Sequence, residues 1–512
     1  MARKNTTPTF THEIALRTNA YQNRKLLIKF RALKELYNVL LQELLDNHNQ
    51  MISNNSFSIA RKLYKNEETR QEAKSLFNQL SNEYNVTNSH IEKLATKIKN
   101  KTYMKDHLDG DSIQVLAKRV FDAYSRWRFK KGGKPRFKSW KNGIRSISGK
   151  KNACISFTKK GKIKWKDLTL DLILDFKDNF GVQAHALNSK IKYCRIIHKI
   201  INGKDRFFVQ LACEGTPLLK RNHENQSEAL GQEVGIDIGV SSVAAVSKNG
   251  ALLEPFCPNV PNLKKEIKAL QRKLSRSSRE NNKECFQDDV FVKKGKHYHR
   301  KKGKVKKGVR LYQSNNYKKN VFRLKELHRL LAEKRKIEHN QLANKILALG
   351  NVLKIEKNSY KAWQKGWFGS TIQAKSPSAF LSTIKRKASK TGGDSYDINA
   401  YKAKFSQYCH VCNDYHKKSL KTRIHECNGK PIAQRDLYSA TLMLNYDINN
   451  SKHLLNSNLF NKVFDDILSA EFNRVVNDKN FRILGLLPQD SCLFEVSEGR
   501  KSHTNVNLDL IK

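Results

Sequence analysis

Hydrophobic and polar positions follow different periods in different parts of the chain, and each period predicts a type of element. From residue 25 to 98 the apolar positions recur at helical spacing. The stripe that they form consists of Leu33, Leu36, Val39, Leu40 and Leu44. We therefore expect a helical module over 25–115, and the segment 1–24 offers a candidate first strand for the β module that follows.

From 155 to 218 the apolar runs are shorter, and turn signals such as Asn202-Gly203 separate them. This pattern predicts a small β-barrel or sheet within a module that spans 116–232. Pro217 is expected to end its last strand, and the polar segment 220–233 is expected to be a linker.

The pattern then predicts a three-strand meander. Its first strand carries Gly235, Asp237 and Gly239 on one face and apolar residues on the other, because neighbouring side chains of a strand point to opposite faces. Asp237 thus stands between two residues without side chains, where a metal ion and a phosphate backbone could approach closely. The second and third strands, 242–247 and 251–256, are joined by an Asn-Gly hairpin turn.

Two further acids lie at the edges of predicted elements. Residues 260–350 form a helical insertion, after which the strand 352–356 ends in Glu356. A later helix begins at Gln434-Arg435-Asp436, which places Asp436 in its first turn. Asp447, about three turns further along this helix, is a reserve ligand.

Charge sets the class of partner. The 512 residues hold 98 Lys and Arg against 47 Asp and Glu, which leaves a net charge of +51. This excess argues against an ordinary metabolic enzyme and favours a nucleic acid as partner, although a merely solvated basic surface is the alternative. No run of eighteen apolar residues occurs in the sequence, and residues 1–22 lack the apolar core of a secretory signal, so we expect a cytoplasmic protein without a membrane partner. The nine cysteines are an odd number, which is a poor disulfide framework and fits a reducing compartment.

Basic and aromatic residues interleave from 114 to 150, and the stretch 293–310 is dense in Lys, Arg and Gly. Cations hold phosphates and rings stack on bases, so both segments are candidates for RNA or DNA binding. For 114–150 an amphipathic helix with core aromatics is an equal alternative. For 293–310 the composition favours a flexible loop that follows phosphates, and a merely solvated run of charges is the alternative. The candidate residues are Arg119, Tyr124, Arg126, Trp127, Arg128, Lys134, Arg136, Phe137, Lys138, Lys301 and Lys302.

The three acids suggest one chemistry when they are considered together. Singly, Asp237 could be a turn residue, Glu356 an exposed strand end, and Asp436 an acid favoured by the helix dipole. In a protein that holds phosphates, three converging carboxylates suit two Mg²⁺ ions, which can activate a water and stabilise the leaving oxygen in phosphodiester cleavage.

A cysteine cluster precedes the last acid. Cys409 and Cys412 form a CxxC knuckle, and Cys427 follows a short basic stretch. Thiolates at this spacing suit tetrahedral Zn²⁺, whereas a degenerate knuckle held by packing is the alternative. The fourth ligand is uncertain: His425 is the first candidate, and His410 and His416 are the others.

Taken together, these motifs resemble the split RuvC-like nuclease domain of TnpB proteins, the insertion-sequence-encoded relatives of type V CRISPR effectors. The resemblance rests on Gly-Ile-Asp-Ile-Gly followed by a hairpin, the isolated strand acid Glu356, and a CxxC ahead of Gln-Arg-Asp-Leu-Tyr-Ser-Ala. It is strongest over 235–444. Where the family usually supplies a second cysteine pair, the last cysteine would fall on Gly429, so this chain departs from the pattern there.

The resemblance implies an α+β multidomain fold: a split RNase H-like (RuvC) α/β nuclease domain, a helical recognition module, a small β-barrel (wedge-like) module and a zinc-knuckle insertion. The nuclease domain would span 233–404 with its insertion at 260–350. The knuckle would span 405–430, the final nuclease motif 431–450, and a C-terminal tail 451–512.

The resemblance also implies that Asp237, Glu356 and Asp436 are catalytic. The activity would be Mg²⁺-dependent, RNA-guided cleavage of double-stranded DNA for a transposable element. The protein would act in a prokaryotic cytoplasm, in association with the nucleoid. Guide RNA and target DNA would be the partners. Two alternatives stay open, namely a guided DNA-binding protein with little cleavage and a transposase-type enzyme that transfers strands.

Overall fold

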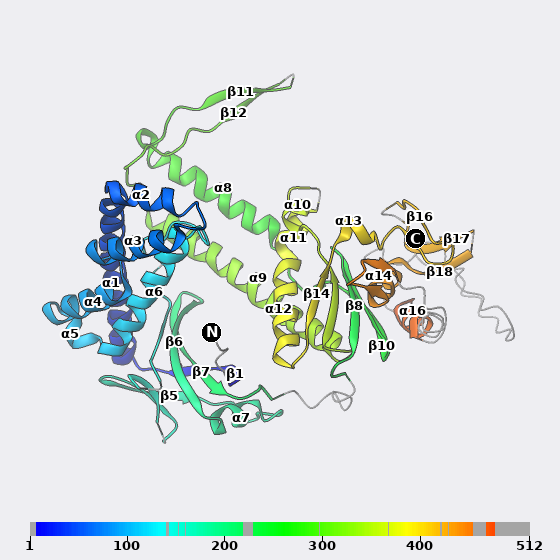
Figure 1. The fold of residues 1–512 in the computed structure, drawn as a ribbon, viewed down its shortest axis with the longest axis horizontal. Coiled ribbons are helices and arrows are strands. Elements are labelled where there is room, and N and C mark those ends of the chain that lie inside the picture. The colour runs from blue at the N-terminus through cyan, green and yellow to red at the C-terminus, as the bar shows by residue number, and fades with distance from the viewer. Residues whose placement is uncertain are drawn as a thin grey trace. The chain divides into compact units, whose positions relative to one another are not determined.

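The structure is a computed structural model that divides into two compact units, Met1–Arg221 and Asn222–Lys512 (Figure 1). It describes residues 7–139, 143–151, 153–158, 160–218, 229–295, 297–366, 368–419, 422–428, 430–453 and 467–476. Most of the predicted linker 220–233 and most of the tail 451–512 lie outside the described residues.

The first unit begins with one strand and continues with helices. Asn19 starts the long helix α1 with a capping box, in which its side chain accepts from the backbone of Gln22 and the Gln22 side chain accepts from the backbone of Asn19. The helices are α1 (Ala20–Ser53), α2 (Asn55–Leu63), α3 (Arg70–Glu83), α4 (Asn88–Lys101), α5 (Met104–His107) and α6 (Gly110–Arg128).

A seven-stranded antiparallel sheet completes this unit, in the order β2-β6-β7-β1-β5-β4-β3. Strand β1 comes from the segment 1–24 and pairs with both β7 and β5. The elements are β1 (Thr9–Arg17), β2 (Ser146–Ser148), β3 (Ile155–Phe157), β4 (Lys162–Trp165), β5 (Leu168–Ile173), α7 (Val182–Asn188), β6 (Ile191–Ile201) and β7 (Lys204–Glu214). Closure of this sheet into a barrel stays a prediction.

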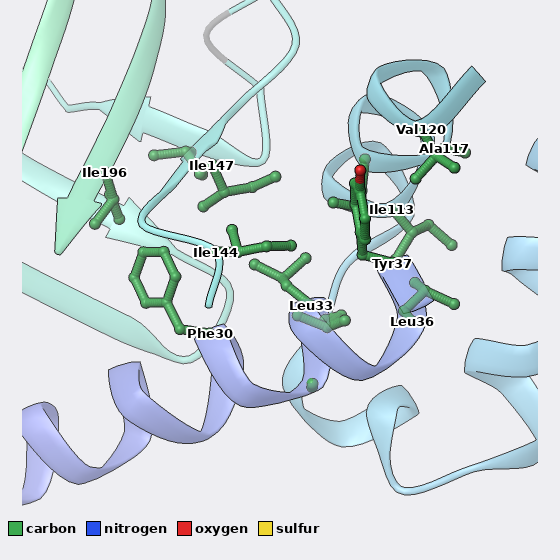
Figure 2. Packing of buried hydrophobic residues seen from close by; sticks show 14 of the residues in the cluster. Phe30, Leu33, Leu36, Tyr37, Ile113, Ala117, Val120, Ile144, Ile147 and Ile196 are labelled. Atoms are coloured by element: carbon green, nitrogen blue, oxygen red, sulfur yellow. The ribbon is translucent and has the colours of Figure 1, made fainter. Parts of the chain in front are cut away.

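One hydrophobic core joins the helices to this sheet. Figure 2 shows Phe30, Leu33 and Leu36 of α1 between Ile113 and its neighbours on α6 and Ile196 of β6. Because the helical segment 25–115 and the β segment 116–232 bury their apolar faces against each other, they pack as one body rather than as two independent cores.

The second unit is built around a mixed five-stranded sheet in the order β10-β9-β8-β13-β14. The predicted meander is confirmed: β8 pairs antiparallel with β9, and β9 with β10. Strand β13 then adds parallel to β8, and β14 parallel to β13. The strands are β8 (Glu233–Ile238), β9 (Ser242–Ser247), β10 (Gly250–Pro255), β13 (Val352–Glu356) and β14 (Ser395–Ile398).

Apolar layers cover both faces of this sheet. Ile236 and Ile238 belong to the core that α9 (Asn315–Leu347) and α12 (Pro377–Lys390) contribute to, whereas Ala244 and Val246 belong to the core of α14 (Arg435–Leu444). A side chain at Gly235 would meet the backbone of α14, since its Cβ would lie 2.0 Å from Ala440 O. Gly235 was expected to let a phosphate backbone approach, but it instead leaves room for the helix α14.

The predicted insertion 260–350 contains two helices, α8 (Lys264–Glu280) and α9, with a two-stranded ribbon between them. The ribbon pairs β11 (Val290–Lys294) with β12 (His297–Lys301) and projects from the ends of the helices (Figure 1). The expectation of a flexible loop over 293–310 was therefore wrong for β11 and β12, where regular cross-strand pairing orders the backbone.

Short elements fill the rest of this unit. They are η1 (Lys283–Cys285), α10 (Tyr360–Trp363), α11 (Gly369–Lys375), α13 (Ala400–Ala403), β15 (Tyr408–Cys409), β16 (Asp414–Tyr415), β17 (Ile424–Cys427), β18 (Lys430–Gln434), β19 (Tyr446–Asp447), β20 (Lys452–His453) and α16 (Ser469–Val476). The helix α16 of the tail binds the edge strand β10 at Leu253. The Glu471 carboxylate accepts a hydrogen bond from the Leu253 amide at 2.6 Å, and Arg474 donates one to the Leu253 carbonyl at 2.9 Å. Among the described residues, no helix has the length and apolar character needed to cross a membrane.

Candidate active site and cysteine cluster

Asp237 and Glu356 are brought together by the register of two parallel strands. Ile236 of β8 lies opposite Ile355 of β13, so the next residue on each strand is an acid. Adjacent strands lie about 4.8 Å apart. The acids therefore come from segments far apart in sequence and meet at the carboxyl ends of neighbouring strands.

Asp436 reaches the same place from the helix that covers the sheet. It lies in the first turn of α14, as predicted, where the Gln434 side chain caps the helix by accepting from the amides of Asp436 and Leu437 at 2.7 and 2.9 Å. Ser242, at the start of β9, donates to Asp436 Oδ2 at 2.7 Å. Arg435 lies 3.4 Å from Asp436 Oδ1. Both carboxylate oxygens are thus held by neighbours.

The site concentrates negative charge away from water. Burial, together with the negative charges of Asp436 and Glu356, raises the pKa of Asp237 well above its usual range, and Arg435 offsets part of this effect. Burial also raises the pKa of Glu356. The charges of both other acids therefore act on Asp237, and a divalent cation would relieve the repulsion among the three carboxylates.

The donor set fits a hard cation. All three residues offer carboxylate oxygens, which Mg²⁺ prefers. Within the described residues, the three cysteines are the group of donor residues gathered closely enough to share one ion, and the three acids do not form a second such group. Acids of this kind hold two ions about 4 Å apart in two-metal phosphodiesterase sites.

Gly235 and Lys354 fix α14 on the sheet. They are register partners on β8 and β13, and α14 lies directly over the glycine. The Lys354 ammonium is buried, donates to the last carbonyl of α14, Leu444 O, at 2.9 Å and pairs with Glu233 at 2.8 Å. A cation is favoured at a helix C-terminus, so Lys354 holds the far end of the helix that carries Asp436.

Asp447 does not belong to this helix. The helix α14 ends at Leu444, and Asp447 lies in β19, where its side chain accepts from the amides of Asn449 and Asn450. Those backbone hydrogen bonds lower the pKa of Asp447. The expectation that it is a reserve ligand on the helix is corrected: its carboxylate closes a turn.

The cysteine cluster forms as predicted. The sulfurs of Cys409, Cys412 and Cys427 lie within 4.8 Å of one another. Two ligands of a tetrahedral Zn²⁺ with Zn–S bonds of about 2.3 Å lie roughly 3.8 Å apart, so the three thiols fit this ion. Burial raises the pKa of Cys409, but hydrogen bonds from the amides of Cys412 and Val411 outweigh it and lower the pKa overall, which favours a thiolate ligand.

The fourth ligand proposed from the sequence, His425, stays a prediction. Its ring stacks on Tyr438 with the centroids 3.8 Å apart, and neither His425 nor His416 is among the residues whose donor atoms gather at the sulfurs. His416 has the better position, because its Nε2 lies 3.0 Å from Cys412 Sγ. His410 is also engaged elsewhere, since its Nδ1 lies 2.9 Å from the Tyr438 hydroxyl.

The knuckle is attached to the helix that carries Asp436. Tyr438 lies two residues after Asp436 on α14. Its hydroxyl accepts a hydrogen bond from the amide of His410 at 3.0 Å, and its ring stacks on the ring of His425. Arg435 donates to the carbonyl of Thr422 at 3.2 Å while it also lies beside Asp436. Arg435 thus contacts both the knuckle and the acid site, whereas Tyr438 contacts the knuckle from the same helix.

The predicted nucleic-acid-binding residues differ in their exposure. Tyr124 is wrong as a stacking residue, because it is fully buried in the core and its hydroxyl pairs with His48 at 2.8 Å. Trp127, Arg128 and Lys138 are half-buried. The exposed candidates are Arg119, Arg126, Lys134, Arg136, Phe137, Lys301 and Lys302. For the helix α6, the alternative of an amphipathic helix with core aromatics holds at Tyr124, and nucleic-acid binding by the exposed residues stays a prediction.

Several residues at the acid site were missed by sequence reasoning. Arg435 adjoins Asp436 in the chain, and Lys354 precedes Glu356 by two, so strand alternation could have placed it on the same face. Ser242 gave no signal. Tyr360, buried beside β13, has its pKa raised by burial first and then by the charges of Asp237 and Glu356, so it also lies close to the acids.

Comparisons with known proteins give weak similarity. No family model and no curated protein matches the sequence. Among solved structures, the chain is similar to a Cas12f1–sgRNA–target DNA complex at 12% identity, with 86% of this chain and 99% of that chain covered and a TM-score of 0.47. A CRISPR–Cas12f ternary complex gives 12% identity, coverage of 84% and 82%, and a TM-score of 0.25.

Proposed function

We propose that the chain is a Mg²⁺-dependent, RNA-guided DNA endonuclease of a transposable element, with Asp237, Glu356 and Asp436 as its catalytic acids. The observation that carries the proposal is the convergence of these three carboxylates, from two parallel strands and one helix, at one edge of a mixed sheet. The net charge of +51 supports a polyanionic substrate.

Each acid has a distinct support in this proposal. Asp237 and Glu356 are fixed by the parallel pairing of β8 and β13, whereas Asp436 is oriented by Ser242 and Arg435. When bound, Mg²⁺ would supply an activated water and stabilise the leaving oxygen. Negative charge repels phosphate, so a protein that only bound nucleic acid would gain nothing from three acids in its groove.

We further propose that Cys409, Cys412, Cys427 and His416 hold a structural Zn²⁺. The three sulfurs are already gathered, and His416 adjoins Cys412. The ion would fix the loop between the cysteines, which contacts α14 through Arg435 and Tyr438. Zinc therefore serves the fold of the knuckle in this proposal, and the acids serve the chemistry.

The test uses the full chain purified with the RNA that it retains. That RNA is sequenced, and a plasmid that carries a match to it is the substrate, with Asp237→Ala and Asp237→Asn compared with the unmodified chain. Both variants should lose cleavage and keep DNA binding. Linear broken plasmid supports the nuclease, and joined products indicate strand transfer. Full cleavage by Asp237→Ala, or by protein free of RNA, would contradict the proposal.

A further inference from the structure

The ribbon β11–β12 of the insertion combines exposed cations with exposed aromatic rings. Residues 290–310 contain ten Lys and Arg and no acid. Phe291 and Tyr298 expose 65% and 69% of their surface, although large rings are ordinarily covered. Neither packing in a hydrophobic core nor the acid site explains why these two rings are exposed to solvent.

The register sorts the ribbon into two different faces. Directly opposite residues of an antiparallel pair share a face. Phe291 pairs with Arg300 and Lys293 pairs with Tyr298, so these four lie together. The other face carries Val290 opposite Lys301 and Val292 opposite His299. One face thus combines two rings with two cations, whereas the other combines valines with basic residues.

Hydrogen bonds tie the base of the ribbon to α8 and to the segment that leads into α9. The Asp289 carboxylate accepts from the amide of Gly303 and from Arg300 Nε, both at 2.7 Å. Arg279 of α8 donates to Gly303 O at 2.7 Å, and the Asn282 side chain binds both backbone groups of Tyr312. A two-stranded ribbon is marginally stable alone, so this network is what holds it in a fixed position.

We infer that the face of Phe291, Lys293, Tyr298 and Arg300 binds single-stranded DNA by stacking its rings on unpaired bases. Diagonal neighbours across a ribbon lie about 7 to 8 Å apart, which allows Phe291 and Tyr298 to receive one base each. Within a duplex, bases stack on each other and offer no open face, so duplex binding would use the cations and leave the rings without a role.

The inference rests on the proposed function and deepens it, because separation of the target duplex would supply such a strand. DNA rather than RNA is indicated because α8 and α9 connect β10 to β13, and the ribbon therefore belongs to the same compact unit as Asp237 and Glu356. An acidic protein segment is the competing partner for a cationic and apolar surface.

The experiment maps contacts with a photoreactive probe. The full chain with its retained RNA is irradiated with an oligothymidylate of about 16 nucleotides that contains 5-iododeoxyuridine, and crosslinked peptides are sequenced. The variant Phe291→Leu with Tyr298→Leu removes the rings but keeps apolar β-forming side chains. The matched control on the opposite face is Val290→Thr with Val292→Thr.

We expect crosslinks at Phe291 or Tyr298, a loss of at least about tenfold in their yield for the leucine variant, and little change for the threonine control. Absence of crosslinks from 290–301, or an equal effect of both variants, would overturn the inference. Unlabelled competitors distinguish the other partners. Stronger displacement of the probe by oligouridylate than by oligothymidylate of the same length would assign the face to RNA, and displacement by polyglutamate at equal charge would assign it to an acidic protein segment. Either outcome would also overturn the inference.

The experiments distinguish a failure of the inference about the ribbon from a failure of the proposed nuclease function. Asp237→Asn leaves both rings in place, so its crosslinks should equal those of the unmodified chain while cleavage is lost. Cleavage by Asp237→Asn would contradict the nuclease proposal without affecting the crosslink result.

Discussion

The acid site and the cysteine knuckle both contact α14 but are maintained in different ways. Asp237 and Glu356 stand on strands whose other face is packed in a hydrophobic core, so their positions do not depend on a metal ion. The knuckle has two-residue strands, an exposed Cys412 and an exposed His416, and few apolar residues to bury. The comparison teaches that the fold positions the acids, whereas the metal must position the knuckle.

The largest expected effect comes from removal of zinc. Chelation, or Cys409→Ala, should unfold 405–430, because binding of a structural zinc ion supplies about 10 to 16 kcal/mol in isolated zinc-finger peptides. Hydrogen exchange should rise throughout the knuckle and in the first turn of α14, while β8 and β13 remain protected. Metal analysis should find one zinc per chain, and His416→Ala should weaken its binding more than the matched His425→Ala.

Unchanged protection of the knuckle after chelation would remove the distinction between the two sites, because the knuckle would then be held by packing. Asp237→Ala is the counterpart on the acid site. It should leave the exchange of both regions unchanged, since it removes a repulsive charge rather than a support.

Gly235→Ala should have the next largest effect. The new Cβ would lie 2.0 Å from Ala440 O and 2.6 Å from Leu444 N, and neither backbone atom can move without α14. We expect destabilisation of about 3 kcal/mol or more and loss of cleavage, measured by denaturant unfolding and plasmid cleavage. Gly133→Ala, where a Cβ meets nothing within 4 Å, is the control and should change unfolding little.

The pH dependence of the acid site should differ from that of the knuckle. The pKa of Asp237 is raised in the folded chain, so without Mg²⁺ the stability should fall as pH rises from the usual Asp range through this raised pKa, and then level off. Mg²⁺ should restore the stability at higher pH and lose its effect as pH falls through the raised pKa, because protons compete for the carboxylates. Thermal unfolding with and without Mg²⁺ measures both effects.

Glu356→Gln provides the control for this dependence. It removes one of the negative charges that raise the pKa of Asp237, so the Mg²⁺-free transition should move to lower pH. A Mg²⁺-free stability that rises over the same pH range would contradict the charge arrangement described above.

Tyr438→Phe should have the smallest effect. The change removes the hydroxyl that receives the amide of His410 but keeps the ring that stacks on His425, so we expect a loss of about 1 kcal/mol. Cleavage should fall only modestly, and exchange of the His410 amide should increase. If exchange at β8 rises instead, the two regions are coupled through the sheet rather than through α14.

Sequence periodicity was a good guide to single elements. The strands 242–247 and 352–356 and the position of Asp436 in the first turn of its helix were predicted and are confirmed. These features depend on alternation, turn chemistry and capping, all of which act over a few residues. The same reasoning failed at Tyr124, because a basic and aromatic helix looks alike whether its rings are buried or exposed.

The sequence by itself determined the charge, the identity of the acids and the presence of a CxxC knuckle, since these are local properties of the chain. Only the tertiary structure decided that Glu356 adjoins Asp237, that Gly235 makes room for α14, and that the His416 ring adjoins the Cys412 sulfur. The physical reason is that strand register and helix packing depend on contacts between residues far apart in the chain. The path of a short metal-binding loop depends in addition on the directions of its side chains. Local spacing encodes neither of these.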